Sequence, residues 1–77
     1  MNPTLEDIIQ LVKVQLGSHN ISPENLFIED LRAESMELLN IICMAEDTFN
    51  VELDEAEIAK VRTVQDFYNL ILSSKKG

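Results

Sequence analysis

One serine, Ser35, stands where an acidic loop meets a long apolar stretch, and it is the residue best placed for chemistry. Glu29 and Glu34 precede it, and the apolar stretch runs over residues 38–49. A serine at such a junction favours the start of a helix. Its hydroxyl would then stand at the positive end of the helix dipole, which suits an exposed phosphate ester. The plainer alternative is that Ser35 only caps the helix.

The remaining reactive side chains do not assemble into a catalytic or metal site. The chain has one histidine, His19, and one cysteine, Cys43. A hydrolytic enzyme needs a nucleophile, a base and an orienting acid, so a catalytic role is the remotest interpretation. We expect His19 on the surface and Cys43 as a small apolar side chain. The acids over 52–57 lack the spacing and the glycine of a calcium loop, so we predict no metal site.

Length and composition indicate one small soluble domain over residues 1–77. Hydrophobic residues make up 45% of the 77, with only two glycines and two prolines, which disfavours disorder. No apolar run reaches membrane-span length. The N-terminus lacks the basic and apolar regions of a signal peptide, and a single cysteine fits a reducing compartment. We therefore expect a cytoplasmic protein, and a monomer.

Negative charge gathers in the middle of the chain. The net charge is −8, yet residues 24–57 hold eleven acids and a single base, Arg32, for a local charge of −10. Such a field repels nucleic acid and anionic membrane and attracts basic protein surfaces. For any one acid the simpler explanation is a solvated, solubilising surface.

Apolar spacing and capping residues predict four helices. Thr4 can cap a first helix that stops at Gly17, and Thr63 can cap a last one trailed by Lys75 and Lys76. A second helix runs from about Ser35 to Phe49, and a short third from Asp54 to near Lys60. The long connection over 18–34 should be pinned to the core by its apolar residues, Ile21, Leu26, Phe27, Ile28 and Leu31. The prediction is an all-α fold, a small four-helix bundle with a long first loop.

The second helix carries more apolar residues than a small bundle can bury. Leu38, Ile41, Ile42, Ala45 and Phe49 share the face that suits the core. Met36, Leu39 and Cys43 form another stripe on nearly the opposite side, with Glu37, Glu46 and Asp47 around it. An apolar stripe rimmed by acids is typical of a docking surface. The alternative is that loop 18–34 folds over the stripe and hides it.

The pattern around Ser35 resembles the attachment site of acyl carrier proteins, where a loop ending in Gly-Ala-Asp-Ser-Leu presents the modified serine. The resemblance covers nearly the whole chain: the long first loop, Phe-Ile-Glu-Asp-Leu over 27–31, Glu-Asp-Thr-Phe-Asn-Val-Glu-Leu over 46–53, and Thr-Val-Gln-Asp over 63–66. It implies a freestanding, non-catalytic carrier. In such a carrier a phosphopantetheinyl transferase attaches 4'-phosphopantetheine to Ser35, and the arm's thiol holds an acyl group as a thioester.

By the same resemblance, Glu34 contributes to recognition by the transferase, and the second helix meets basic docking surfaces on acyl-processing enzymes of fatty acid or polyketide-type biosynthesis. The partner-binding residues would be Met36, Glu37, Leu39, Cys43, Glu46 and Asp47. The bundle core could shelter a short apolar chain. The strong acidity favours acyl over peptidyl cargo by resemblance only.

Four positions depart from the family pattern. Arg32 replaces the usual glycine, Glu34 the usual aspartate, Met36 the usual leucine, and Asn40 an acid. Glu34 keeps the charge but adds a methylene, so a contact with the transferase's metal ion must shift. These departures favour a specialised carrier. They also leave open an acidic protein-interaction module that docks through the same helix and is never modified.

Overall fold

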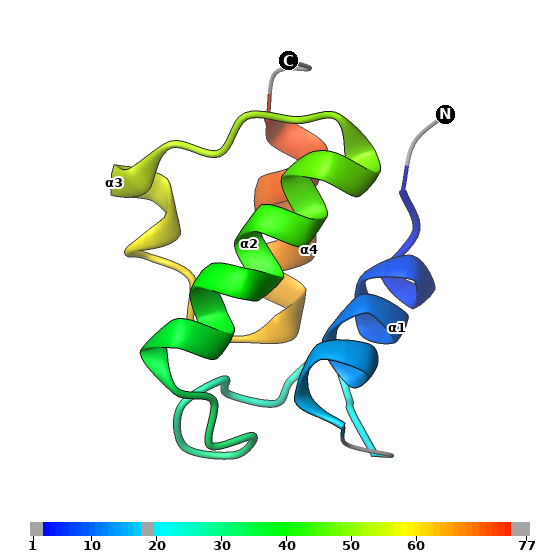
Figure 1. Ribbon diagram of the computed structural model, residues 1–77, viewed down its shortest axis with the longest axis vertical. Coiled ribbons are helices and arrows are strands. Elements are labelled where there is room, and N and C mark those ends of the chain that lie inside the picture. The colour runs from blue at the N-terminus through cyan, green and yellow to red at the C-terminus, as the bar shows by residue number, and fades with distance from the viewer. Residues whose placement is uncertain (1–2, 18–19, 75–77) are drawn as a thin grey trace.

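The computed structural model describes residues 3–17 and 20–74, which form an all-helical bundle (Figure 1). The helices are α1 (Leu5–Leu16), α2 (Ser35–Phe49), α3 (Glu55–Ile58) and α4 (Val64–Ser73). This confirms the predicted fold class, the short third helix and the long first loop. The expectations for His19, Lys75 and Lys76 fall on residues outside the described ranges.

Capping residues set the ends of α1 and α4, as the sequence predicts. The Thr4 N–H donates to Asp7 Oδ2 at 3.0 Å, and the Asp7 N–H donates back to Thr4 Oγ1 at 3.2 Å. Thr63 and Asp66 repeat this box at α4, with both distances near 3 Å (3.1 and 3.0 Å). Gly17 ends α1 with φ of 67°, a left-handed backbone that glycine adopts without strain.

The core lies where α1 packs against both α2 and α4, while α3 packs against α4. The largest fully buried side chains come from these three long helices: Ile8, Val12, Ile41, Val64 and Ile71. Phe27, from the long loop, meets Phe67 edge-on with ring centroids 6.1 Å apart. The loop thus contributes a core residue of its own.

Backbone hydrogen bonds fasten the long loop to the turn before α4. The Phe27 N–H donates to the Arg62 carbonyl at 2.9 Å, and the Val64 N–H donates to the Asn25 carbonyl at 3.2 Å. Leu26 and Thr63 form an isolated antiparallel bridge between them. We call this set of contacts, between residues 23–27 and 62–65, the loop clasp.

One loop residue does not do what the sequence led us to expect. Ile21 and Phe27 are buried and Leu26 and Leu31 half-buried, but Ile28 is 57% exposed. The clasp directs Phe27 into the core, and the chain turns immediately afterwards over residues 27–30. Its neighbour Ile28 is therefore left mostly exposed, and the prediction that Ile28 pins the loop to the core is wrong.

The clasp also depends on Asp66, and this gives a pH prediction. The amides of Thr63 and Arg62 both donate to Asp66 Oδ2 at 3.1 Å, and these two bonds, Thr63 first, lower the pKa of the carboxyl. A lowered folded-state pKa means that the stabilisation is complete above the unfolded value and is lost as pH falls through the folded one.

We expect Asp66→Asn to lower the free energy of unfolding by about 0.5–1 kcal/mol at neutral pH, since the carboxylate is only half-buried and solvent screens it. That difference from wild type should shrink as pH falls below about 4, where the wild-type carboxyl also becomes neutral. Urea unfolding of both proteins at several pH values measures it. A penalty that stays constant into strong acid would show that the carboxylate charge is not involved.

Candidate functional site

The head of α2 is capped by acids, and the serine hydroxyl takes no part. Glu34 is the N-cap, with the extended backbone that this position needs, and Ser35 is the first helical residue. The Glu34 N–H donates to Glu37 Oε1 at 2.9 Å. Ser35 is exposed, and among the described residues its hydroxyl forms no hydrogen bond. The alternative that Ser35 serves only as the N-cap is therefore wrong, and its oxygen is open to solvent.

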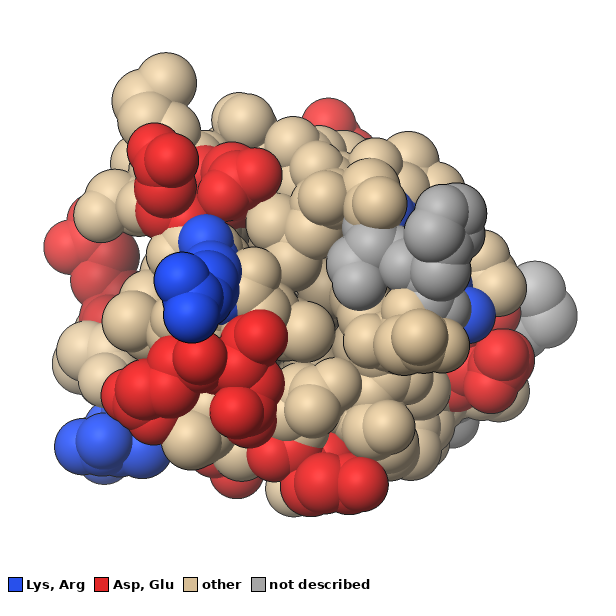
Figure 2. Space-filling view, turned by 90° about the horizontal axis from the view of Figure 1, so that it is seen from below, with Lys and Arg blue, Asp and Glu red and all other residues tan. Residues whose placement is uncertain are grey.

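The loop leading to Ser35 takes an unusual backbone turn at Arg32. Its φ of 54° lies in the left-handed region, which costs a side-chain-bearing residue about 1–2 kcal/mol relative to glycine. This explains physically why a glycine suits the position. The Arg32 side chain is exposed, so the turn places a guanidinium on the surface three residues before Ser35. Seen from this end of the bundle, acidic side chains gather around the few basic ones (Figure 2).

The apolar stripe on α2 is open, as the docking interpretation predicts. Met36 is 72% and Leu39 58% exposed, and Cys43 is exposed as well. Ile41 and Ala45, on the other side of the helix, are buried. Because the clasp holds the loop against the α4 turn, the loop does not cover the stripe. The alternative that loop 18–34 hides these residues is wrong.

The acids predicted for docking differ in how freely they can act. Asp47 is exposed, whereas Glu37 and Glu46 are half-buried and each accepts a backbone hydrogen bond. Glu46 Oε2 accepts from the Leu53 N–H at 3.1 Å, which holds the turn after α2. Asp47 is the acid among the three with no such structural duty among the described residues. The sequence did not distinguish these roles.

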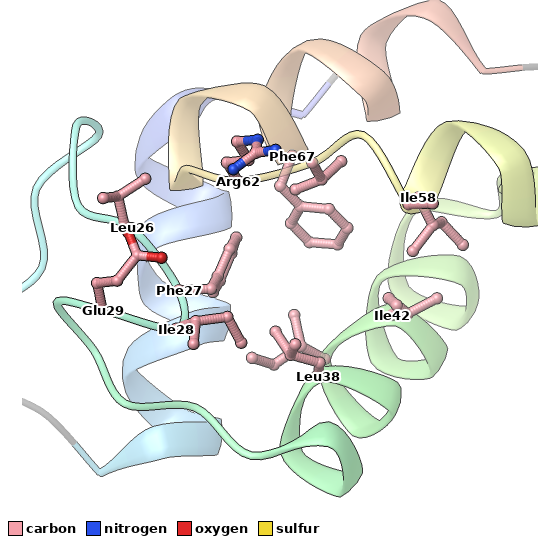
Figure 3. A pocket seen from close by; sticks show the side chains of 12 residues that line it. Leu26, Phe27, Ile28, Glu29, Leu38, Ile42, Ile58, Arg62 and Phe67 are labelled. Atoms are coloured by element: carbon pink, nitrogen blue, oxygen red, sulfur yellow. The ribbon is translucent and has the colours of Figure 1, made fainter.

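A cavity of about 330 Å³ lies between the loop, α2, α3 and the start of α4. Most of the side chains that line it are apolar, and Figure 3 shows Leu38 and Ile42 of α2 facing Phe27 and Phe67 across it. The sequence indicated a sheltered apolar space but missed two charged rim residues, Glu29 and Arg62. The capping signature at Thr63 places residue 62 just before α4, but only the clasp brings it next to the loop.

Other site chemistries find no support in the part of the chain that the structure describes. There, no three His, Cys, Asp or Glu side chains come together as a metal could require. None of its helices combines the length and apolarity that crossing a membrane would take.

The comparisons with known proteins agree with this geometry. Residues 6–71 match the sequence model of a family described as "Phosphopantetheine attachment site". An acyl carrier protein of Helicobacter hepaticus is 32% identical over 74 residues, covering 94% of this chain and 97% of that protein. One from Chlamydia felis is 38% identical, covering 88% of this chain and 91% of that protein. The fold, the exposed serine and these matches together define a protein of the class of phosphopantetheine-bearing carriers.

The chain belongs to the acyl carrier protein family. Its cofactor is covalently attached 4'-phosphopantetheine, its partners are acyl-processing enzymes, and it is a carrier rather than a catalyst. The acyl carrier protein of Thermotoga maritima shares the fold with a TM-score of 0.73 at 23% identity, over 88% of this chain and 81% of that one. A solved Mycobacterium tuberculosis structure, provisionally assigned as an acyl carrier protein, is also 23% identical. It matches with a TM-score of 0.84 over 88% of this chain and 93% of that one.

Exposure of the stripe predicts a difference between two neighbouring residues of α2. We expect Leu39→Ala to change the free energy of unfolding by less than about 0.5 kcal/mol, because Leu39 is mostly solvated. Ile41→Ala, whose side chain is 1% exposed, should cost about 2–5 kcal/mol. Chemical denaturation measures both. Equal losses for the two variants would place Leu39 in the core and remove the open stripe.

Proposed function

We propose that this protein carries acyl intermediates as thioesters on a phosphopantetheine arm attached to Ser35. The observation that supports this most directly is the exposed hydroxyl at the first position of α2, within the matched residues 6–71. A phosphodiester there faces the unpaired N–H groups of the first helical turn, worth about 0.3–1 kcal/mol. Glu34 opposes this by repulsion, so the net local stabilisation of the arm is small.

The attachment chemistry belongs to a partner transferase. The Ser35 oxygen attacks the β-phosphorus of coenzyme A, forms the phosphodiester, loses its proton, and releases adenosine 3',5'-bisphosphate. No base from this chain lies within hydrogen-bonding distance of the hydroxyl among the described residues. We propose that Glu34, exposed beside the serine, contributes to recognition by that transferase.

The stripe and its acids form the proposed docking surface for the transferase and the acyl-processing enzymes. Leu39 and Met36 provide apolar contact, and Cys43 extends the stripe. Asp47 is the most available carboxylate for an ion pair with a partner. Glu37 and Glu46 each accept a backbone hydrogen bond, but their negative charges still contribute to the electrostatic potential of the surface. Exposed ion pairs contribute about 0.2–1 kcal/mol each, so their main effect is to steer and speed association. Weak, fast docking suits a carrier that must leave each partner.

The setting we propose is fatty acid or polyketide-type biosynthesis in the cytoplasm, with residues 1–77 acting as one monomeric domain. The open, apolar cavity supports acyl rather than peptidyl cargo, because the methylene groups of an acyl chain gain from burial there. The acidity of the surface supports partners with basic docking faces. Arg32 in the recognition loop supports a specialised set of partners, because its positive charge would repel the basic docking face of an ordinary partner.

Mass spectrometry tests the attachment. After incubation with coenzyme A and a broad-specificity phosphopantetheinyl transferase, we expect a mass gain of one phosphopantetheine unit. Ser35→Ala should abolish the gain, and Ser73→Ala, which removes another exposed serine hydroxyl, should leave it intact. No gain with several transferases would favour the unmodified interaction module, and a gain retained in Ser35→Ala would move the site.

Association kinetics test the docking surface. Charge reversal at the exposed Asp47 should slow association with a basic transferase about two- to fivefold at low salt, and the difference should fade as ionic strength rises. Charge reversal at Glu6, an exposed acid on α1, serves as the matched control and should matter less. Stopped-flow fluorescence measures the rates. Equal slowing by both variants would mean that only net charge counts, and a rate insensitive to salt would exclude electrostatic steering.

A further inference from the structure

The rim of the cavity holds two opposite charges that do not pair with each other. Glu29 comes from the loop and Arg62 from the turn before α4, and both line the cavity (Figure 3). The one salt bridge among the described residues joins Lys60 and Glu57 instead. Neither the Glu29 carboxylate nor the Arg62 guanidinium forms a side-chain hydrogen bond within that part of the chain. Alongside the larger effect of the backbone hydrogen bonds, the Arg62 guanidinium helps to lower the pKa of the nearby Asp66 carboxyl, but within the described ranges no hydrogen bond or salt bridge ties the guanidinium or the Glu29 carboxylate in place.

The clasp fixes the backbones from which these side chains extend. The Arg62 N–H donates to Asp66 Oδ2 at 3.1 Å, and its carbonyl accepts from the Phe27 N–H at 2.9 Å. On the loop side, the Asp30 N–H donates to the Leu26 carbonyl at 3.0 Å, across the turn that contains Glu29. The backbones that carry the two charges are therefore fixed beside the cavity.

Below the rim the cavity is apolar. Phe27, Leu38, Ile42 and Phe67 face into it, so the hydrocarbon part of a guest belongs inside and an oxygen belongs at the edge. An acyl chain delivered by an arm on Ser35 enters tail first, because its other end is the thioester. The carbons nearest the thioester then lie at the rim.

We propose that this rim selects acyl chains with a hydroxyl at the third carbon, and that Arg62 and Glu29 are the selecting residues. This inference rests on the proposed function. A guanidinium only donates hydrogen bonds and a carboxylate only accepts them, whereas a hydroxyl does both. The hydroxyl accepts from Arg62 and donates to Glu29, so one group satisfies both sides of the rim.

Other acyl groups satisfy the rim less well. A 3-oxo group accepts from Arg62 but offers nothing to Glu29, and a saturated chain satisfies neither residue. A free carboxylate on the chain would be repelled by Glu29 and by the protein's net charge of −8. The selectivity comes from both residues, so removing either one should reduce it.

The test uses the intact protein loaded at Ser35 with octanoyl-, 3-oxooctanoyl- or 3-hydroxyoctanoyl-pantetheine. Chains of eight carbons fit inside a cavity of about 330 Å³, because at ~30 Å³ per carbon, the volume share of one liquid water, they fill only part of it. Cleavage by hydroxylamine reports how well each thioester is sheltered. Each rate is divided by that of the matching free thioester, which removes the intrinsic effect of the substituent.

We expect the 3-hydroxyacyl form to be protected about two- to tenfold more than the octanoyl form, the range that one hydrogen bond provides. Arg62→Leu and Glu29→Leu, which leave no hydrogen-bonding group at either position, should each reduce that extra protection, while Lys60→Leu, at a neighbouring exposed cation outside the cavity lining, should keep it in full. Circular dichroism melts of the apo proteins check that the variants fold.

The possible failures separate the two claims. If Ser35 cannot be loaded by any transferase, the proposed function fails and this inference falls with it. If loading succeeds but hydroxyl and saturated chains are equally protected, or Arg62→Leu keeps the full difference, only the selectivity is overturned. Greater protection of the 3-oxo form would also overturn it, because Glu29 would then have no role.

Discussion

The clasp between the long loop and the turn before α4 is the contact on which the rest of the structure depends. Two backbone bonds, from Phe27 to Arg62 and from Val64 to Asn25, join segments more than thirty residues apart in the chain. Closing such a long loop costs conformational entropy, which burial of Phe27 against Phe67 helps to offset. With the loop held there, α2 is left with an open outer face, and the space beside it becomes a cavity.

Stability and function are divided among the acids around α2. Glu34 and Glu37 cap the helix and Glu46 holds the turn after it, so the Ser35 hydroxyl is not needed by the fold. Leaving Leu39 in solvent forgoes about 1.5–3 kcal/mol of burial, a sizeable share for a domain of 77 residues. That loss is understandable if the residue is buried part of the time against a partner.

Much of the fold could be predicted from the sequence because its signals are local. Thr4 with Asp7, Thr63 with Asp66, and Gly17 mark helix ends through contacts between residues a few positions apart. The open stripe on α2 was also predictable, since its spacing leaves it opposite the buried face. These inferences needed only helical periodicity and the limited capacity of a small core.

The features that escaped prediction depend on contacts distant in the chain or on fine backbone geometry. Ile28 looked like a core residue, but the turn after Phe27 leaves it mostly exposed along the cavity lining. Serine is the commoner cap by composition, yet the backbone at Glu34 has the extended shape and Ser35 is already helical. Glu29 and Arg62 meet at one rim only through the clasp, which no pattern along the chain reveals.

The most direct measurement locates the phosphorus in the protein purified from its own cells. Phosphorus–proton correlation spectroscopy detects which side-chain protons couple to a phosphodiester. We expect one phosphorus signal coupled to the Cβ protons of Ser35 and to the pantetheine methylene. A protein with no phosphorus, or with phosphorus coupled to a different serine, would show that the Ser35 hydroxyl is not kept free to bear the arm.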